Sequence, residues 1–400
     1  MPGSRPQLAV GLDAGSAGTR CVVCAVEDGR IRFLGSGEVE SRGWAKSRIA
    51  DRDQMSESVR LAAREAERQA QISFEAVVVG LGGSAVSGAN ARGVYEFGRP
   101  REIEDSDMRY AVELACRVRL EDERILLQVL PQDFTVDGRA GIVNPRGTRA
   151  SRLEANVHVV TTSAIDHQAL VSAVHLAHLA VEETVYEAMA AAYACVLPEE
   201  RAKGVAVADI GLHSTELVIY DGDAMVQAAS VPVSGDHFTR DVSFGFHVAH
   251  DDAERLKIEY GCAILGLTSD NALIEVPSAE NRPVREAPRR ELNDMLEARA
   301  QYLFEYIKKK VLEADMDRSL LEGIVLCGGG ARLNGMCDVA ELVLSCPARN
   351  GLPVGIQDWP SHLNNPTWTT AAGLAMYSGR LKQHREGRKQ RPPFLNLLMR

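Results

Sequence analysis

One pattern of apolar and polar positions occurs twice in the chain. Residues 205–220 form an apolar run that ends at Asp209, a short turn of Gly and polar residues, and a second apolar run. Residues 8–26 repeat this order with Asp13 in the position of Asp209, and each Asp is followed two positions later by Gly. Each copy predicts a buried strand, a tight turn and a second strand. Two copies predict two similar halves that face one cleft.

The residue types in the two turns suit phosphate binding. A Gly after the strand end permits a tight turn, and small residues such as Ser16, Ser214 and Thr215 bring N–H groups and hydroxyls close to an anion. Asp13 and Asp209 would repel phosphate directly, whereas carboxylates can hold a hydrated Mg²⁺ ion that bridges to phosphate oxygens. A single copy would suit an ordinary hairpin, but the repeated Asp-x-Gly register favours a nucleotide site.

The remaining segments predict an α/β protein. Strands are predicted at residues 33–41, 76–81, 157–161 and 224–230, and helices at residues 53–70, 105–118, 166–179, 181–197, 234–246, 250–260, 289–314 and 364–379. Residues 323–336 predict a strand that leads through a Gly-rich turn into a helix, which lets the backbone approach a nucleotide. Residues 84–158 depart from the α/β pattern of the preceding residues. They are interpreted as an inserted α+β subdomain, with strands around residues 125–136.

Composition and charge narrow the class of protein. The 400 residues exceed what one hydrophobic core usually holds, which predicts two or more lobes. The formal net charge of −10 argues against nucleic-acid binding. The eight Cys residues stand among apolar neighbours, as reduced core residues do, and Cys21 and Cys24 are expected on opposite faces of one strand. The sequence shows no signal segment and no apolar stretch of about eighteen residues.

Residues 380–400 differ in kind from the rest of the chain. They contain seven basic residues against a single acid, Glu386. A short apolar cluster follows two prolines and includes Phe394, Leu395, Leu397 and Leu398. Basic residues beside such a cluster suit an anionic membrane surface, and the alternative is a disordered polar tail.

Taken together, these motifs resemble the superfamily of actin, Hsp70 and the sugar kinases. The turns LDAGSAGTR and VADIGLHST resemble its two phosphate loops, and IVLCGGGARLNGM resembles its adenosine motif. Over nearly the whole chain, the sequence is similar to the FtsA family of bacterial cell-division actin homologues. The insertion is the most specific part of this resemblance, with the stretches GLGGSAVSGANARGVYEF and VLPQDFTVDGRAGIVNPRG. The type IV pilus protein PilM shares the general layout and is the nearest alternative.

The resemblance implies an α/β, actin-like ATPase fold of duplicated ribonuclease-H-like domains with an inserted α+β subdomain. The implied parts are residues 1–83 and 161–198 (subdomain 1A), 84–160 (inserted subdomain 1C), 199–240 (subdomain 2A), 241–322 (subdomain 2B), 323–380 (2A and the return to 1A) and 381–400 (a basic linker and membrane-targeting tail).

The resemblance also implies a site for ATP and Mg²⁺. Asp13 and Asp209 would position the ion through water, and Glu187 would orient the attacking water. Arg20 stands where an actin-type phosphate-binding Lys is usual. The implied nucleotide-binding residues are Gly15, Ser16, Ala17, Arg20, Gly211, Ser214, Thr215, Glu254, Lys257, Gly328, Gly329, Gly330 and Ala331.

The second phosphate loop departs from the family pattern, because Leu212 and His213 stand where Gly is usual. If the loop requires positive φ angles there, each residue would be strained by roughly 1–3 kcal/mol. The sequence therefore leaves ATP hydrolysis open, and at most a weak ATPase activity is expected.

For function, the resemblance implies an ATP-binding protein that forms filaments on anionic lipids of the inner membrane at the division septum. It would tether FtsZ through the C-terminal peptide of FtsZ and contact other division proteins through the inserted subdomain. PilM-like pilus assembly is the main alternative. A sugar-kinase-type phosphotransferase needs a general base, and no second acidic residue stands in a clear position for that role. An Hsp70-like chaperone would need a further substrate-binding domain.

Overall fold

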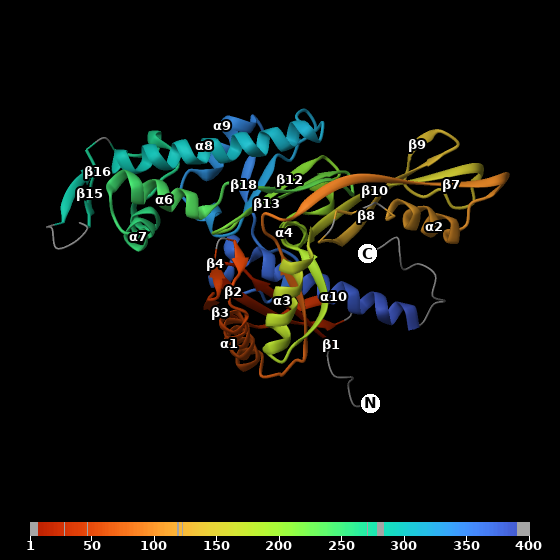
Figure 1. Ribbon diagram of the computed structural model, residues 1–400, viewed down its shortest axis with the longest axis horizontal. Coiled ribbons are helices and arrows are strands. Elements are labelled where there is room, and N and C mark those ends of the chain that lie inside the picture. Colours follow the sequence, from red (N-terminus) through yellow and green to blue (C-terminus); the bar gives the residue numbers. More distant parts are fainter. Residues whose placement is uncertain are drawn as a thin grey trace.

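The computed structural model describes residues 7–27, 29–45, 47–117, 120–121, 123–269, 271–277 and 284–389. Two large β-sheets form the centre of the molecule. Two arms extend from the second sheet in opposite directions, and Figure 1 shows them on the left and on the right. Residues 235–269, 271–277 and 284–313 lie in one arm, and residues 87–117 and 123–160 build the other.

The first sheet belongs to the N-terminal half. Its strands are, in spatial order, β11 (Ala180–Tyr186), β6 (Ala76–Leu81), β1 (Gln7–Ala14), β2 (Gly18–Glu27), β3 (Arg30–Glu40) and β19 (Ile356–Gln357). Helices α1 (Arg52–Ala70) and α3 (Ala164–Leu176) contribute to the core on one face of this sheet. Helix α1 begins at Arg52 because the Asp51 side chain accepts hydrogen bonds from the first backbone N–H groups of the helix.

The second sheet has nine strands. Their spatial order is β18 (Ala348–Asn350), β17 (Ile324–Cys327), β12 (Val205–Ile210), β13 (Thr215–Asp221), β14 (Ala224–Val231), β7 (Ser87–Glu102), β10 (Arg149–Ser163), β8 (Arg124–Val136) and β9 (Arg139–Ile142). Strand β12 pairs antiparallel with β13 and parallel with β17, as β1 pairs antiparallel with β2 and parallel with β6. This equivalence confirms the predicted duplication.

Two helices fill the space between the sheets. Helices α4 (Glu187–Cys195) and α10 (Thr369–Lys389) share a core cluster with strands of both sheets. They pack closely because Gly373 has no side chain, and a Cβ at this position would lie 1.7 Å from the carbonyl oxygen of Ala190. The first residue of α4 is thereby placed at the junction of the two halves.

The arm drawn in green and cyan in Figure 1 covers the outer face of the second sheet. Its elements are α6 (Gly235–Phe246), α7 (His250–Tyr260), β15 (Leu273–Val276), β16 (Arg285–Pro288) and α8 (Arg289–Glu313), with α9 (Met336–Leu344) packed on the same core. The short helix α5 (Pro198–Arg201) precedes β12.

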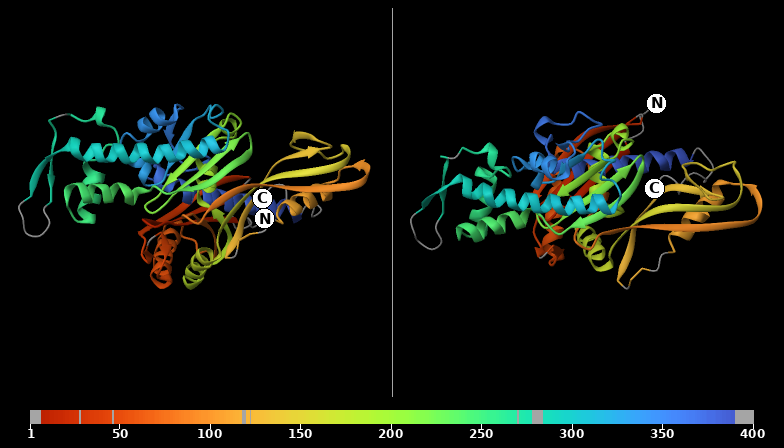
Figure 2. Two further views of the ribbon diagram at one scale, coloured as in Figure 1. Left: turned by 45° about the horizontal axis from the view of Figure 1, so that its top comes forward. Right: turned by 90° about the horizontal axis from the view of Figure 1, so that it is seen from above.

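The other arm is the inserted subdomain. Helix α2 (Asp105–Ala115) packs against β7, β8 and β10 around a separate hydrophobic core that includes Phe134 and Leu153. The arm continues the second sheet, because Ser87 of β7 pairs with Ala229 of β14. Figure 2 gives two further views of this arm, in which its long strands extend away from the body of the molecule.

Two predicted helices differ in the structure, and one long strand was not predicted. Residues 181–197 were expected as one helix, but β11 occupies Ala180–Tyr186 and α4 begins only at Glu187. The reason is that the β-branched residues of this segment pair in parallel with β6. Strand β7 was not predicted, and α10 continues to Lys389, ten residues beyond the expected end.

Five of the eight cysteines are buried as predicted, whereas Cys116, Cys337 and Cys346 are only half-buried and do not belong to the core in the expected way. Cys21 packs in the core with α1, and Cys24 packs in a separate core with α10, so the two face opposite sides of β2. All eight cysteines are free thiols. Within the described part of the chain, none of the helices combines the length and hydropathy required to cross a membrane.

Candidate nucleotide site

Two adjoining cavities lie where the turns of the two halves meet. The smaller cavity, about 120 Å³, is lined by both predicted phosphate loops and by the start of α4. The larger cavity, about 270 Å³, lies toward α6, α7 and the Gly-rich turn after β17. The residues that line both cavities are Ala17, Arg20, Gly211, Leu212, Gly329 and Thr367.

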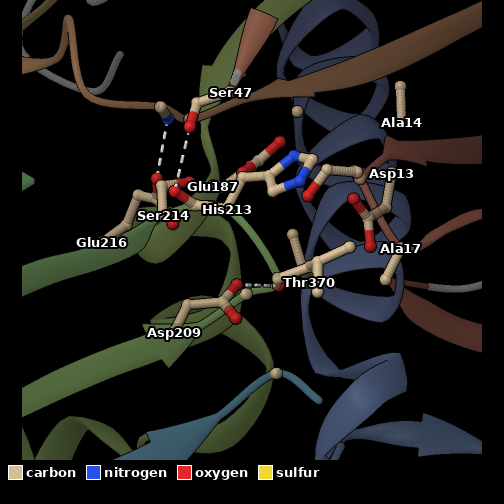
Figure 3. A pocket seen from close by; sticks show the side chains of 18 of the residues that line it. Asp13, Ala14, Ala17, Ser47, Glu187, Asp209, His213, Ser214, Glu216 and Thr370 are labelled. Carbon is tan, nitrogen blue, oxygen red and sulfur yellow. Dashed lines mark hydrogen bonds between the residues drawn. The ribbon is translucent and has the colours of Figure 1, made fainter. Parts of the chain in front are cut away.

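Five carboxyl side chains line the smaller cavity. Asp166 of α3 is paired with Arg48, and the other four lie close to one another (Figure 3). These four are Asp13 of β1, Glu187 of α4, Asp209 of β12 and Glu216 of β13. Thr370 donates a hydrogen bond to Asp209 with an Oγ1–Oδ2 distance of 2.5 Å. The backbone N–H of Gly83 donates to Glu216 with an N–Oε1 distance of 2.7 Å. Each half therefore contributes two acids to this cluster of four.

Burial raises the pKa of all four carboxyl groups. It raises the pKa of Asp13 to about 7, an effect that Arg20 opposes and Asp209 reinforces. Burial and the neighbouring Asp209 raise the pKa of Glu216 to about 7. Burial also raises the pKa of Asp209, against the hydrogen bond from Thr370, and raises the pKa of Glu187 well above its usual value. The cluster therefore retains protons near neutral pH when no cation compensates its charge.

Gly82, directly after β6, leaves room for two of these groups. A Cβ at position 82 would lie 2.2 Å from Oε2 of Glu187 and 2.9 Å from Oε1 of Glu216. These distances place a carboxylate of the first half and a carboxylate of the second half against the same backbone atom. The absence of a side chain at position 82 is therefore a condition for this arrangement.

The oxygen ligands at the smaller cavity fit a hard cation such as Mg²⁺. Among the residues that the structure describes, no group of three or more His, Cys, Asp or Glu side chains is arranged to hold a metal ion directly. An ion here would keep water ligands and take phosphate oxygens, with Asp13 and Asp209 as water-mediated partners.

Arg20 lies beside Asp13 and lines both cavities. Its Nη2 is 2.7 Å from Oε1 of Glu38, and its Nη1 is 3.8 Å from Oδ2 of Asp13. Its guanidinium carbon lies 5.9 Å from the ring centroid of Trp368. Arg20 therefore compensates acidic side chains, and its place between the cavities also suits the charge of a phosphate.

The second phosphate loop is anchored to the start of α6. The N–H of Gly235 donates to the carbonyl of Gly211 at 2.9 Å, and the N–H of Asp236 donates to the carbonyl of Leu212 at 2.8 Å. Neither Leu212 nor His213 is among the described residues with positive φ. The strain expected from the sequence is therefore absent, because the loop turns its carbonyls toward α6 without entering the left-handed region.

This loop also offers donors to an anion. Within the described part of the chain, the backbone N–H groups of Leu212, His213 and Ser214 have no hydrogen-bond acceptor. Consecutive free N–H groups in a turn form an anion-binding concavity. The Leu and His side chains therefore leave the phosphate-binding capacity of the backbone intact.

The larger cavity contains the other predicted nucleotide contacts. Lys257 and Glu254 form an ion pair with an Nζ–Oε2 distance of 2.6 Å, and Lys257 also donates to Thr239 Oγ1 at 2.8 Å. Both line this cavity together with Gly329 and Gly330. The pair is held in place by α6 and α7, so it presents polar atoms to this cavity.

The structure separates the predicted residues into three groups. Those lining at least one cavity are Asp13, Gly15, Ser16, Ala17, Arg20, Glu187, Asp209, Gly211, Ser214, Glu254, Lys257, Gly328, Gly329 and Gly330. Thr215 and Ala331 line neither, because Thr215 is fully buried with its hydroxyl donated to the carbonyl of Val233, and Ala331 packs in the core of the second half. The tail residues Phe394, Leu395, Leu397 and Leu398 lie outside the described residues.

The structure adds site residues that the sequence analysis missed. The sequence analysis found no second acid in a clear position for a general base, whereas Glu216 lines the same cavity as Glu187. Its signal was an isolated acid within the apolar run 215–220. Thr370, on α10, reaches Asp209 only through tertiary packing. Ser47 reaches His213 from the hairpin of β4 (Trp44–Ala45) and β5 (Arg48–Ile49) in the other half.

The duplicated sheets and the cleft between them define a protein with the actin-like fold. Among solved structures, a PilM–PilN type IV pilus biogenesis complex matches with a TM-score of 0.67 and 18% identity, over 93% of this chain and 98% of that chain. MreB5 of Spiroplasma citri bound to ADP matches with a TM-score of 0.56 and 14% identity, over 95% of this chain and 98% of that chain. These two likenesses concern the fold.

The sequence comparisons identify the family within this class. The family model described as cell division protein FtsA matches residues 206–373, and the model of the SHS2 domain inserted in FtsA matches residues 83–161. The cell division protein FtsA of Pseudomonas aeruginosa is 30% identical over 372 residues, which cover 93% of this chain and 89% of that protein. The chain belongs to the FtsA family of actin-like cell-division proteins.

Proposed function

We propose that this protein binds ATP with Mg²⁺, assembles into filaments, and tethers FtsZ filaments to the cytoplasmic face of the inner membrane at the division septum. The observation that carries the proposal is the family match over 93% of the chain. The insertion that distinguishes the family matches its own family model. The PilM alternative has support from the fold only, at 18% identity.

The cleft supports the nucleotide part of the proposal. Two predicted phosphate loops, the second with free N–H groups, line the cavity that holds the four neighbouring carboxyl groups suited to a hydrated cation. The adjoining cavity contains Lys257 and Glu254, which gives the order expected for phosphates, Mg²⁺ and adenosine. Glu187 is the candidate for orienting the attacking water, at the end of the cleft away from Lys257. Glu216 beside it permits a phosphotransferase in principle, but the family match favours the cell-division role.

A reconstitution experiment tests the tethering function. Vesicles with anionic lipids are mixed with fluorescent FtsZ filaments, ATP and Mg²⁺, with and without this protein. The expected result is recruitment of FtsZ to the vesicles only when the protein is present. FtsZ without its C-terminal peptide is the matched control and is expected to stay in solution. Binding to a PilN N-terminal peptide instead of the FtsZ peptide would contradict the proposal and favour pilus assembly.

Deletion of residues 392–400 is expected to release the protein from anionic vesicles. Each buried apolar residue contributes up to about 1.5–3 kcal/mol, and each nearby basic residue about 1 kcal/mol. Immobilising a segment on the membrane costs conformational entropy, so a single tail binds weakly and filaments bind through many tails at once. Vesicle sedimentation measures the effect.

The matched control for the deletion replaces Phe394 and Leu395 by Ser and keeps the chain length. It is expected to lose binding as the deletion does, and high salt is expected to weaken the binding of the unaltered protein. Unchanged sedimentation of the deletion variant would contradict the membrane role of the tail.

A further inference from the structure

His213 brings an imidazole ring to the phosphate end of the cleft. Its side chain lines the smaller cavity, and Figure 3 shows it pointing into the pocket that Asp13, Glu187 and Asp209 also line. Unlike Leu212, it does not line the larger cavity, where Lys257 lies. The ring therefore stands at the end of the cleft that would hold the terminal phosphate of a nucleotide.

The backbone of His213 is held from both halves of the protein. Ser47 of the β4–β5 hairpin donates to the His213 carbonyl with an Oγ–O distance of 3.1 Å. The preceding carbonyl, that of Leu212, accepts from the start of α6. These contacts fix the position from which the ring projects into the cavity.

The two ring nitrogens have different surroundings. Nδ1 is buried and has no hydrogen-bond partner among the described residues, whereas Nε2 is not buried. Burial lowers the pKa of His213, so the ring is neutral near pH 7 and has one N–H group. A buried N–H without an acceptor is rarer than a buried lone pair, so we assign the hydrogen to Nε2, the ring nitrogen that is not enclosed.

The cavity beside the ring has room for a ligand. One water molecule needs roughly 10–15 Å³ of such volume, whereas this cavity has about 120 Å³. Its other side chains include the cluster of four acids, which would repel a terminal phosphate unless a cation and hydrogen-bond donors compensate. The imidazole N–H is one such donor.

We propose that the Nε2–H of His213 donates a hydrogen bond to the terminal phosphate of bound ATP and makes this site select ATP over ADP. The inference rests on the proposed ATP-binding function. In the family pattern this position is Gly, which can offer a phosphate only its backbone. Here the His213 side chain would make an additional contact.

Titration calorimetry with Mg-ATP and with Mg-ADP tests this inference. The His213→Ala variant is expected to bind ATP at least roughly tenfold more weakly, while its ADP affinity stays within about twofold, because ADP has no phosphate at this position. The His213→Gln variant keeps an N–H donor and is expected to regain part of the ATP affinity. His175→Ala, on the exposed side of α3, is the matched control and is expected to bind both nucleotides normally.

Each other outcome has a defined meaning. Equal losses for ATP and ADP would overturn the inference, and so would tighter ATP binding by His213→Ala, since the ring would then occupy the place of the phosphate. Thermal melting of each variant identifies a folding defect, in which case His213→Gln alone decides. If the unaltered protein binds neither nucleotide, the proposed function fails, and this inference fails with it.

Discussion

The Asp13→Asn variant, without nucleotide or metal, is expected to be more stable than the unaltered protein at pH 8, and to lose Mg²⁺-dependent ATP binding. Asp13 is buried beside three other acids, and its pKa is raised from 3.8 to about 7. Asn has nearly the same shape without the charge. The expected gain in the free energy of unfolding at pH 8 is about 2–4 kcal/mol.

The pH dependence follows from the sign of this shift. Between pH 4 and pH 7, the folded protein binds more protons at Asp13 and Glu216 than the unfolded chain, whose carboxyl groups have pKa values near 3.8 and 4.5. The free energy of unfolding therefore falls as the pH rises through this window. Denaturant melts at pH 5 and pH 8 should show a smaller loss for Asp13→Asn than for the unaltered protein.

Ligand binding should respond in the opposite direction. Mg²⁺ and ATP together compensate the ionised carboxylates, so they should stabilise the unaltered protein more at pH 8 than at pH 5, and Asp13→Asn should lose at least roughly tenfold in Mg-ATP affinity. Asp223→Asn, in the exposed turn before β14, is the control and should change neither property. A destabilised Asp13→Asn variant at pH 8 would show that the carboxylate is fully compensated in the nucleotide-free protein.

Replacement of Gly82 by Ala is expected to disrupt the cluster itself. The added Cβ would lie 2.2 Å from Oε2 of Glu187, a distance that folded proteins do not tolerate, and 2.9 Å from Oε1 of Glu216. Both carboxyl groups must move, and Glu216 loses its place beside the N–H of Gly83. A destabilisation of about 1–3 kcal/mol and a loss of Mg-ATP binding of at least roughly tenfold are expected.

Calorimetry and thermal melting measure both effects. Gly266→Ala is the matched control, because a Cβ there meets no atom within 4 Å and its φ is not positive. That variant should keep both stability and nucleotide affinity. Normal Mg-ATP binding by Gly82→Ala would mean that Glu187 and Glu216 are not required in their present positions.

Much of the fold could be predicted from local patterns. The repeated apolar run, Asp-x-Gly turn and apolar run predicted two equivalent strand pairs, and β1–β2 and β12–β13 confirm them. Buried strands and amphipathic helices leave a periodic signal in the sequence, so most elements were located within a few residues. This periodic signal fails where a neighbouring strand determines the structure. Residues 180–186 precede an Ala-rich segment and were therefore predicted as helix, but they form a strand because they pair with β6.

Some features of the candidate site could likewise be predicted from the sequence, and others could not. The sequence by itself determined the family and placed the two predicted phosphate loops, with Asp13 and Asp209, at one cleft, because these depend on residue types at fixed spacing along the chain. Only the tertiary structure showed that Glu216, Thr370 and Ser47 lie at the cleft. It also showed that Thr215 does not line the cleft and that Leu212 and His213 adopt unstrained backbone angles. The physical reason is that contacts between distant residues and backbone angles within a turn are decided by packing between the two halves, which local sequence does not encode.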